Sequence, residues 1–218
     1  MTKKEEAELK KAARLNAERI RIDAMTEYER QYAFYGLICG VDEAGRGPLA
    51  GPVVAGAVIL DPDVEILYLN DSKKLSEKRR EELYEQIMEK AVAVGVGIIS
   101  SGEIDEINIL QATYKAMREA VLRLKIEPGF IIADAVTIPG IDIPQTAIVK
   151  GDEKSVSIAA ASIIAKVTRD RLCLDYDRLY PGYGFASHKG YGTAAHIEAI
   201  KKYGPLDIHR QTFIHKYI

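Results

Sequence analysis

Five short apolar runs, rich in β-branched residues, constrain the fold of this chain more than any other feature. They occupy residues 36–41, 53–60, 92–99, 130–133 and 146–149. Runs of this length, bounded by Gly, Pro and Asp, are typical of buried strands. Helical patterns occupy residues 77–91, 104–124, 155–170 and 194–202. This order predicts an α/β domain with a mixed central sheet of about five strands, flanked by helices and followed by a C-terminal helical region.

The first 30 residues differ in character from the rest of the chain. They are rich in Ala, Glu, Lys and Arg, and apolar side chains recur at helical spacing at Leu9, Ala13, Ala17 and Ile20. We therefore predict an N-terminal helical arm over residues 1–35 and one domain over residues 36–218. A chain of 218 residues, 47% of them hydrophobic, can bury a core of ordinary size.

The composition says more about the cellular compartment of the protein than about its function. The formal net charge of -2, from 30 basic and 32 acidic residues, does not indicate a nucleic-acid binder, but local patches matter more than the sum. The two cysteines, Cys39 and Cys173, form no metal-binding or paired motif, which favours a reducing compartment. No apolar run has the length of a membrane span, and the charged N-terminus lacks the apolar core of a signal peptide. We expect a cytoplasmic protein without a membrane partner.

Acidic residues directly follow three of the predicted strands. Asp42 and Glu43 come after the first strand, Asp134 follows residues 130–133, and Asp152 comes shortly after residues 146–149. If these strands are neighbours in one sheet, the four carboxylates converge at one edge. Each acid taken alone could instead be a helix-start or turn residue, and for Asp152 alone that is the better interpretation.

Carboxylates that converge repel one another, and divalent cations relieve that repulsion. A set of oxygen ligands without Cys or His favours Mg²⁺ or Mn²⁺ over Zn²⁺. Two such ions roughly 3.5–4 Å apart can stabilise both the attacking and the leaving oxygen of a phosphodiester. The pattern therefore predicts metal-dependent phosphoryl transfer to water, with the sequence leaving the choice between Mg²⁺ and Mn²⁺ open.

Several longer blocks resemble the bacterial ribonuclease HII family, the type 2 ribonucleases H. They occur in the same order as in that family and cover most of the chain after residue 35: GVDEAGRGPLAGPVVAGAVIL, NDSKKLSEKRR, DEINILQATYKAM, IVKGDEKSVSIAAASIIAKVTRDR, YGFASHKGYGT and YGPLDIHRQTF. The resemblance implies a ribonuclease H-like fold. It also implies an endonuclease that hydrolyses the RNA strand of RNA–DNA hybrids. Such an enzyme incises 5′ to single ribonucleotides in duplex DNA, leaving 3′-OH and 5′-phosphate ends.

The resemblance also implies roles for individual residues. The candidate catalytic and metal-binding residues are Asp42, Glu43, Asp134 and Asp152. Gly45, Arg46 and Gly47 match the loop that recognises the ribonucleotide 2′-hydroxyl, the group that distinguishes RNA from DNA. Tyr191 matches a tyrosine that stacks on the next, deoxy, sugar, and Lys73 matches a lysine near the substrate backbone. From the residues alone, a tight turn after a strand is the better explanation of residues 45–47, and a loop tyrosine covering the core explains Tyr191.

Four further residues are weaker candidates for contacts with the substrate backbone: Lys74, Lys166, Arg169 and His188. Lys166 and Arg169 share a face of one predicted helix, three residues apart. Such charges are more often simply solvated. His188 is a candidate because it lies close to Tyr191 in sequence.

Other functions remain to be distinguished. Carboxylates at the edge of such a sheet also suit a DNA-directed nuclease or a transposase-like strand transferase. Residues 45–47 together with Tyr191 favour ribonucleotide recognition over these. A non-catalytic hybrid-binding module is disfavoured because all four carboxylates are present. A ribonuclease HIII is disfavoured because that type has an extra N-terminal domain and another residue in place of Arg46.

The expected partners are the nucleic-acid substrates, an RNA–DNA hybrid or a ribonucleotide-containing DNA duplex. We expect a monomer with no obligate protein partner, engaged in ribonucleotide removal from DNA and in primer clearance during replication. Residues 211–218 loosely resemble a sliding-clamp-binding peptide but lack its paired aromatic residues, so clamp binding through the tail is not expected.

Overall fold

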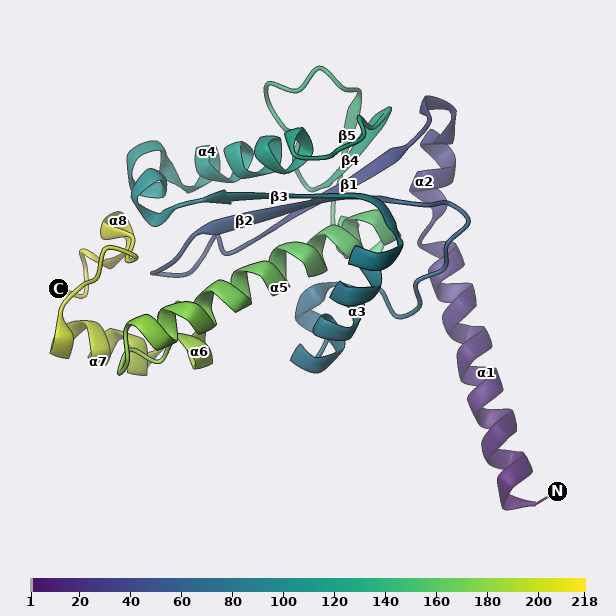
Figure 1. The fold of residues 1–218 in the computed structure, drawn as a ribbon, viewed down its shortest axis with the longest axis horizontal. Helices are drawn as coiled ribbons and strands as arrows, with labels where there is room; N and C mark the ends of the chain where they lie inside the picture. Colours follow the sequence, from purple (N-terminus) through teal and green to yellow (C-terminus); the bar gives the residue numbers. More distant parts are fainter. Residues whose placement is uncertain (1) are drawn as a thin grey trace.

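A five-stranded mixed sheet forms the centre of the protein, in the strand order β3-β2-β1-β4-β5 (Figure 1). The computed structural model describes residues 2–218. β1 (Ile38–Ala44) pairs antiparallel with β2 (Val53–Leu60), and β2 pairs antiparallel with β3 (Ala91–Ile99). On the other side β1 pairs parallel with β4 (Phe130–Asp134), which pairs parallel with β5 (Gln145–Ile148). The predicted mixed five-stranded sheet is therefore confirmed.

Helices cover both faces of the sheet (Figure 1). α4 (Ser101–Leu122) lies on one face, where its buried side chains pack against β1, β2 and β3. α5 (Val156–Leu179) crosses the other face, and α3 (Glu77–Lys90) packs beside it. The central strands β2, β1 and β4 are buried on both faces, which explains why they read as continuous apolar runs rather than as alternating patterns.

Close backbone contact brings α5 onto β1. A Cβ atom on Gly40 would lie 2.1 Å from the carbonyl carbon of Ser157, and one on Gly56 would lie 2.5 Å from the carbonyl oxygen of Ala161. Only glycine permits that approach, so these two positions set the distance between the sheet and the helix. The turn that precedes α5 is thereby placed beside the end of β1.

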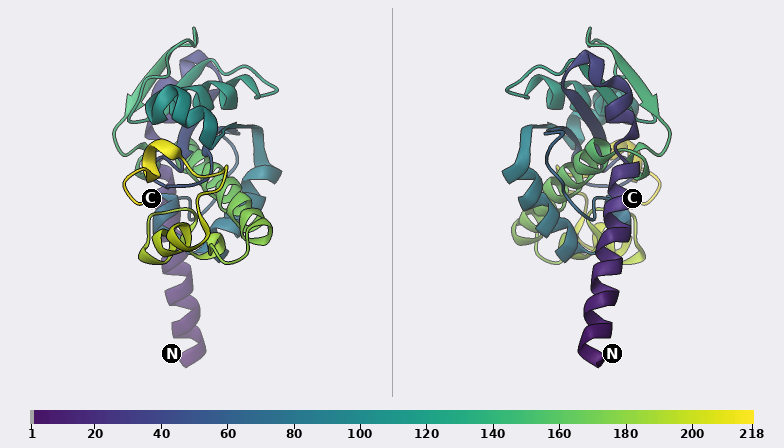
Figure 2. Two further views of the ribbon diagram at one scale, coloured as in Figure 1. Left: turned by 90° about the vertical axis from the view of Figure 1, so that its left-hand side faces the viewer. Right: turned by 90° about the vertical axis from the view of Figure 1, so that its right-hand side faces the viewer.

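The N-terminal arm consists of α1 (Lys3–Ala24), α2 (Glu27–Tyr32) and the short 3-10 helix η1 (Ala33–Tyr35). The first part of α1 projects away from the body of the protein (Figure 2). Only its end docks, where Ile22 and Met25 join the cluster that includes α3 and α5. Leu9 and Ile20 are exposed, so the helical spacing correctly indicates a helix but not a buried face.

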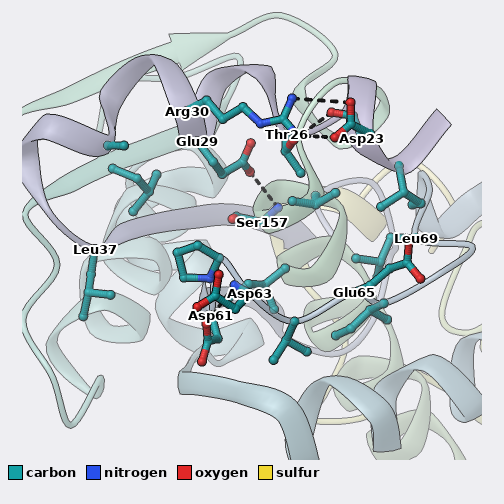
Figure 3. A pocket seen from close by; sticks show the side chains of 18 of the residues that line it. Asp23, Thr26, Glu29, Arg30, Leu37, Asp61, Asp63, Glu65, Leu69 and Ser157 are labelled. Atoms are coloured by element: carbon teal, nitrogen blue, oxygen red, sulfur yellow. Dashed lines mark hydrogen bonds and ion pairs between the residues drawn. The ribbon is translucent and has the colours of Figure 1, made fainter. Parts of the chain in front are cut away.

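A cavity of about 340 Å³ lies between the docked part of the arm and the start of β1 (Figure 3). Its wall includes Glu29, whose Oε1 accepts hydrogen bonds from Ser155 and from the Ser157 N–H. The cavity lies beside Ile38 and Leu60, at the opposite end of β1 from the carboxylates. It is therefore separate from the predicted metal site.

The remaining elements are short helices. They are η2 (Ser72–Lys74), η3 (Gly151–Glu153), α6 (Phe185–His188), α7 (Ala194–Tyr203) and α8 (Gln211–Ile214). α6, α7 and α8 gather beyond one end of α5 and form the predicted C-terminal helical region (Figure 1). Among residues 2–218, no helix is both long and apolar enough to span a bilayer.

Candidate functional site

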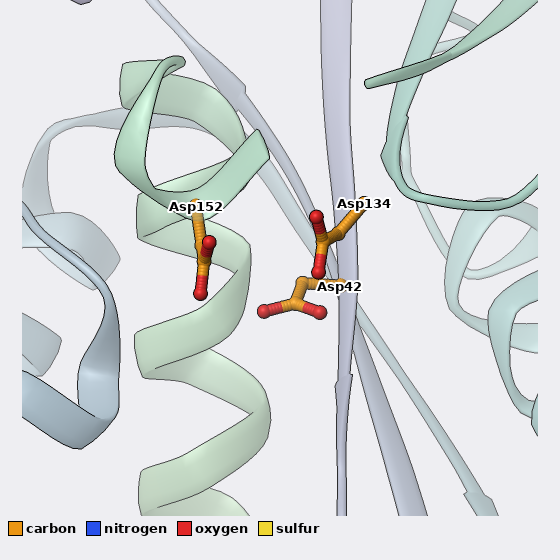
Figure 4. A group of neighbouring side chains, drawn as sticks. All are labelled: Asp42, Asp134 and Asp152. Carbon is orange, nitrogen blue, oxygen red and sulfur yellow. The ribbon is translucent and has the colours of Figure 1, made fainter. Parts of the chain in front are cut away.

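Three of the four predicted carboxylates meet at the edge of the sheet. Asp42 and Asp134 come from the neighbouring parallel strands β1 and β4, and Asp152 comes from η3 at the start of α5 (Figure 4). One oxygen from each carboxylate lies within 4.8 Å of the others. Acids from three separate parts of the sequence thus form one group that could hold a metal ion.

Backbone hydrogen bonds fix the orientation of two of these carboxylates. Asp42 Oδ1 accepts from the N–H of Glu43 at 2.7 Å, and Asp134 Oδ1 accepts from the N–H of Gly151 at 2.7 Å. The second contact joins the end of β4 to the turn that carries Asp152. Main-chain N–H groups therefore help to hold Asp42 and Asp134 in place.

The charges in this cluster destabilise one another. Burial, followed by repulsion from Glu43 and Asp134, raises the pKa of Asp42 well above its ordinary value. Burial and the neighbouring carboxylates of Asp71 and Asp134 raise the pKa of Asp152 to about 6. A group that is costly to ionise because of like charges is well suited to a divalent cation, which favours the ionised form.

Glu43 stands slightly apart from the three aspartates. Its carboxylate contacts Arg46, with 3.4 Å between Oε1 and Nη1, and it is not among the three whose oxygens lie within 4.8 Å of one another. Burial raises the pKa of Glu43, and the Arg46 guanidinium opposes that shift. Glu43 therefore borders the cluster, between the aspartates and the loop at residues 45–47.

A fifth acid, Asp71, lies at the site and was not among the predicted residues. Asp71 is buried and caps the start of the 3-10 turn η2, where its Oδ1 accepts from the N–H of Lys73. Burial alone would lower the pKa of Lys73, but the carboxylates of Asp71 and Asp42 raise it overall. In sequence Asp71 reads only as a turn residue, because nothing before it marks a strand end.

The two predicted substrate-recognition segments lie side by side. A Cβ atom on Gly47 would lie 3.7 Å from the ring of Tyr191, and the Leu49 N–H donates to the Gly190 carbonyl at 2.8 Å. The Tyr191 side chain is 45% exposed, so its ring is available to a ligand. Gly45 has a φ of +97°, and a Cβ there would lie 2.1 Å from Arg169 Nε, so this position requires glycine.

A chain of histidines supports the Tyr191 segment from within. The Leu206 N–H donates to His209 Nδ1, His209 Nε2 lies 3.1 Å from His196 Nε2, and His196 Nδ1 lies 2.9 Å from the Tyr191 carbonyl. The backbone contacts require His209 to donate to His196, and His196 to donate to Tyr191. Burial lowers the pKa of His196 to about 4, consistent with a neutral ring. His196 was not predicted, because a histidine in the first turn of a helix carries no such signal.

The weaker candidates have mixed outcomes. Lys74 is exposed and pairs with Glu153 at 2.9 Å, close to Asp152 in sequence. Lys166 pairs with Asp170 at 2.5 Å inside the protein, so its ammonium group already has a partner. Both lysines would have to exchange an ion pair to contact a phosphate.

The placements of Arg169 and His188 contradict their assignment to substrate-backbone contacts. The Arg169 side chain is 1% exposed and donates to three main-chain carbonyls. His188 Nε2 contacts the Tyr183 carbonyl and its Nδ1 accepts from the Gly190 N–H, so both ring nitrogens are occupied. Both side chains bond the backbone around residues 50 and 183–190.

A mixed sheet in this strand order, with carboxylates from adjacent strands at one edge and a helix across each face, defines the class of ribonuclease H-type proteins. Comparisons with known proteins agree. The solved ribonuclease H2 of Pyrococcus horikoshii is 31% identical, with a TM-score of 0.68 over 83% of this chain and 96% of that one. The ribonuclease HII in a PCNA complex from Archaeoglobus fulgidus is also 31% identical, with a TM-score of 0.66 over 80% and 93%.

Sequence comparison specifies the family. The family model described as Ribonuclease HII matches residues 39–217. A ribonuclease HII of Lachnoclostridium phytofermentans is 63% identical over 201 residues, which cover 92% of this chain and 79% of that relative. The chain belongs to the ribonuclease HII family, as its motifs indicated, and this membership supports a ribonuclease H endonuclease activity.

Proposed function

We propose that this protein hydrolyses the RNA strand of RNA–DNA hybrids and incises 5′ to single ribonucleotides embedded in duplex DNA, leaving a 3′-hydroxyl and a 5′-phosphate. The observation that carries this proposal is the position of the residue 45–47 loop. It lies between a carboxylate cluster and an exposed tyrosine: Arg46 contacts Glu43, and Gly47 approaches the Tyr191 ring. A group that reads the sugar thus adjoins a group suited to phosphodiester hydrolysis.

The donor set of the cluster fits a hard divalent cation. We assign its ligands to the three clustered aspartates, Asp42, Asp134 and Asp152, and to the bordering Glu43, which the family motif adds as the fourth carboxylate. Oxygen donors without sulfur or imidazole favour Mn²⁺ or Mg²⁺, and neutralising the mutual repulsion of these acids would favour binding. When bound, a pair of such ions supplies an activated water and charge stabilisation at the leaving oxygen.

The protein's own groups would orient the substrate. The loop of Gly45, Arg46 and Gly47 would meet the 2′-hydroxyl through its outward backbone groups, because the exposed Gly47 has no side chain that blocks the approach. The exposed Tyr191 ring offers a flat apolar surface to the following deoxyribose. The Lys73 ammonium group, beside the cluster, would offset the charge of the scissile phosphate.

This activity would start the removal of ribonucleotides from DNA and contribute to primer clearance during replication, in the cytoplasm of the cell. We propose a monomer without an obligate protein partner. The Archaeoglobus fulgidus relative occurs in a complex with PCNA. In this chain Ile214 is fully buried and residues 211–214 form α8, which supports the proposal that the tail does not act as a free clamp-binding peptide.

A substrate panel tests the proposal. Labelled duplexes of one sequence would carry a long RNA strand, one ribonucleotide or only DNA, each incubated with Mg²⁺, Mn²⁺ or EDTA. We expect metal-dependent cleavage of the first two and none of the third. Cleavage of the all-DNA duplex would favour a DNA-directed nuclease instead. Cleavage of the long hybrid alone would keep the carboxylate site and overturn the roles given to residues 45–47 and Tyr191.

A further inference from the structure

Two buried arginines hold the loop at residues 45–52 from its inner side. Arg210, in front of α8, donates to the carbonyls of Gly45, Arg46 (2.8 Å) and Gly51 (2.9 Å from Nη2, 3.1 Å from Nε). Arg169, on α5, donates to the carbonyls of Pro52 and Ala50 at 3.1 Å each, and to that of Lys189 at 2.9 Å. Both guanidinium groups therefore recognise the backbone of this loop.

This bonding fixes the direction of two backbone N–H groups. In a trans peptide unit the carbonyl and the following N–H point in opposite directions. Because Arg210 draws the carbonyls of Gly45 and Arg46 inward, the N–H groups of Arg46 and Gly47 point away from Arg210. Gly45 is buried whereas Arg46 and Gly47 are exposed, which agrees with this orientation. The loop thus presents two adjacent donors on its outer side.

Arg169 also couples this loop to Tyr191. Its Nη1 bonds the Lys189 carbonyl while its Nη2 bonds the Ala50 carbonyl, so one guanidinium spans both segments. The Arg169 Cζ lies 5.9 Å from the centre of the Tyr191 ring, within the range of a cation–π contact. Movement of Arg169 would therefore change the spacing between the outward N–H groups and the ring.

Burying the two guanidinium groups of Arg169 and Arg210 costs free energy, because both lose their hydration. Both side chains are at most 1% exposed, and burial together with the nearby Arg169 charge lowers the pKa of Arg210 to about 9. Two guanidinium groups that bond only uncharged carbonyls leave their positive potential acting through the loop. That potential favours an electron-rich oxygen in front of the N–H groups of Arg46 and Gly47.

We infer that Arg169 and Arg210 are positioning residues for sugar recognition: they hold the Arg46 and Gly47 N–H groups and Tyr191 in the arrangement that distinguishes a ribonucleotide from a deoxynucleotide. This inference rests on the proposed function. It assigns the discrimination to two side chains that do not themselves reach the substrate. Residues 45–47 would then contact the substrate, while Arg169 and Arg210 beneath them hold the loop in place.

Arg210→Lys and Arg169→Lys test the inference, because lysine keeps the charge but lacks the planar guanidinium, whose separate nitrogens bond carbonyls of different segments. The matched control is Arg171→Lys, an α5 arginine that instead pairs on the surface with Glu81 and Glu85. Binding would be measured in EDTA to two fluorescent duplexes of one sequence, one with a single ribonucleotide and one all DNA. Unfolding in urea would establish that each variant is folded at the assay temperature.

We expect either lysine variant to reduce the preference for the ribonucleotide duplex about tenfold, through the loss of aligned hydrogen bonds. Affinity for the all-DNA duplex should stay within about twofold, since phosphate contacts dominate it. A folded variant that keeps the preference would overturn the inference, as would equal weakening for both duplexes. If Arg210→Lys does not fold, the result for Arg169→Lys decides. A wild-type protein without any preference would instead contradict the proposed function.

Discussion

The carboxylate cluster should make the metal-free protein less stable as pH rises. Burial and the neighbouring acids raise the pKa of Asp152 from 3.8 to about 6 in the folded protein. A raised folded-state pKa gives stability that is fully present below about pH 4 and is lost as pH rises through about 6. Asp42 has a pKa raised in the same direction by burial and by Glu43, which extends the loss to higher pH.

The magnitude follows from the difference between the two pKa values. The change from 3.8 to about 6 corresponds to about 3 kcal/mol for a fully desolvated carboxylate. Solvent at the open edge of the cluster screens part of this, so we expect about 1–2 kcal/mol. Asp152→Asn removes the charge at nearly constant shape. In EDTA at pH 8 the free energy of unfolding of Asp152→Asn should therefore exceed that of the wild type by about 1–2 kcal/mol.

Urea unfolding in EDTA at pH 4.5 and pH 8, followed by circular dichroism, measures this difference. The advantage of Asp152→Asn should shrink at pH 4.5, where the wild-type carboxyl is mostly protonated. Asp175→Asn is the matched control, since Asp175 lies on the surface of α5 beside Arg178. Adding Mg²⁺ or Mn²⁺ at pH 8 should stabilise the wild type more than Asp152→Asn. An Asp152→Asn protein less stable than the wild type in EDTA at pH 8 would refute the reasoning.

Three further predictions concern the remaining parts of the site. Asp134→Asn should lower cleavage at least 100-fold while leaving binding to a hybrid within about threefold; unchanged turnover would contradict the metal assignment. Tyr191→Ala should reduce cleavage at a lone ribonucleotide more than tenfold and change the melting temperature by less than about 3 °C, because the ring is half exposed. If the melting temperature fell together with the cleavage, Tyr191 would instead be a residue of the core. The His196 pKa, lowered by burial from 6.5 to about 4, contributes stability present above pH 6.5 and lost as pH falls through about 4. His196→Asn should therefore show a smaller loss of stability between pH 6.5 and 4, and an equal loss would contradict the neutral histidine chain.

The strands could be predicted from sequence because each is a short apolar run, and β1, β2 and β4 are almost entirely buried. The run at residues 53–60 coincides with β2, and the runs at 92–99 and 130–133 differ from β3 and β4 by one residue. The first strand continues beyond the predicted end at Val41 to Ala44. Asp42 and Glu43 are therefore strand residues. Acidic residues are rare in strands, so the sequence pattern placed the end of this strand before them. Pairing with β2 explains the longer strand, since the ladder extends to Ala44 opposite Val54.

Helix ends and side-chain partners were harder to predict. α5 runs to Leu179, nine residues beyond the predicted end at Asp170, because Asp170 is buried beside Lys166 and Arg80 rather than ending the helix. α4 contains a break at Asn108, with a φ of 67°, which the periodicity of its apolar side chains did not indicate. The contact of Asp170 with Arg80 joins residues distant in sequence, whereas Asn108 Oδ1 accepts from the nearby N–H groups of Leu110 and Gln111.

The same limit applies to the site. The aspartates of the cluster could be predicted because each lies at or shortly after the end of a strand, and strand ends can be located from the sequence. The inward direction of Arg169 and His188, and the approach of Asp71 to Asp152, depend instead on packing between segments far apart in sequence. Residue type and spacing cannot distinguish a basic side chain that faces a phosphate from one that faces a carbonyl beneath the same loop.

Mapping the cut in a duplex with one ribonucleotide tests the central claim most directly. The strand would be end-labelled, incubated with Mg²⁺ or Mn²⁺, and its product compared with size standards bearing a 3′-hydroxyl. We predict a single metal-dependent cut on the 5′ side of the ribonucleotide, abolished by EDTA, with the all-DNA duplex intact. A cut elsewhere, or an equal cut without the ribonucleotide, would contradict the claim that residues 45–47 and Tyr191 direct this carboxylate site to the sugar.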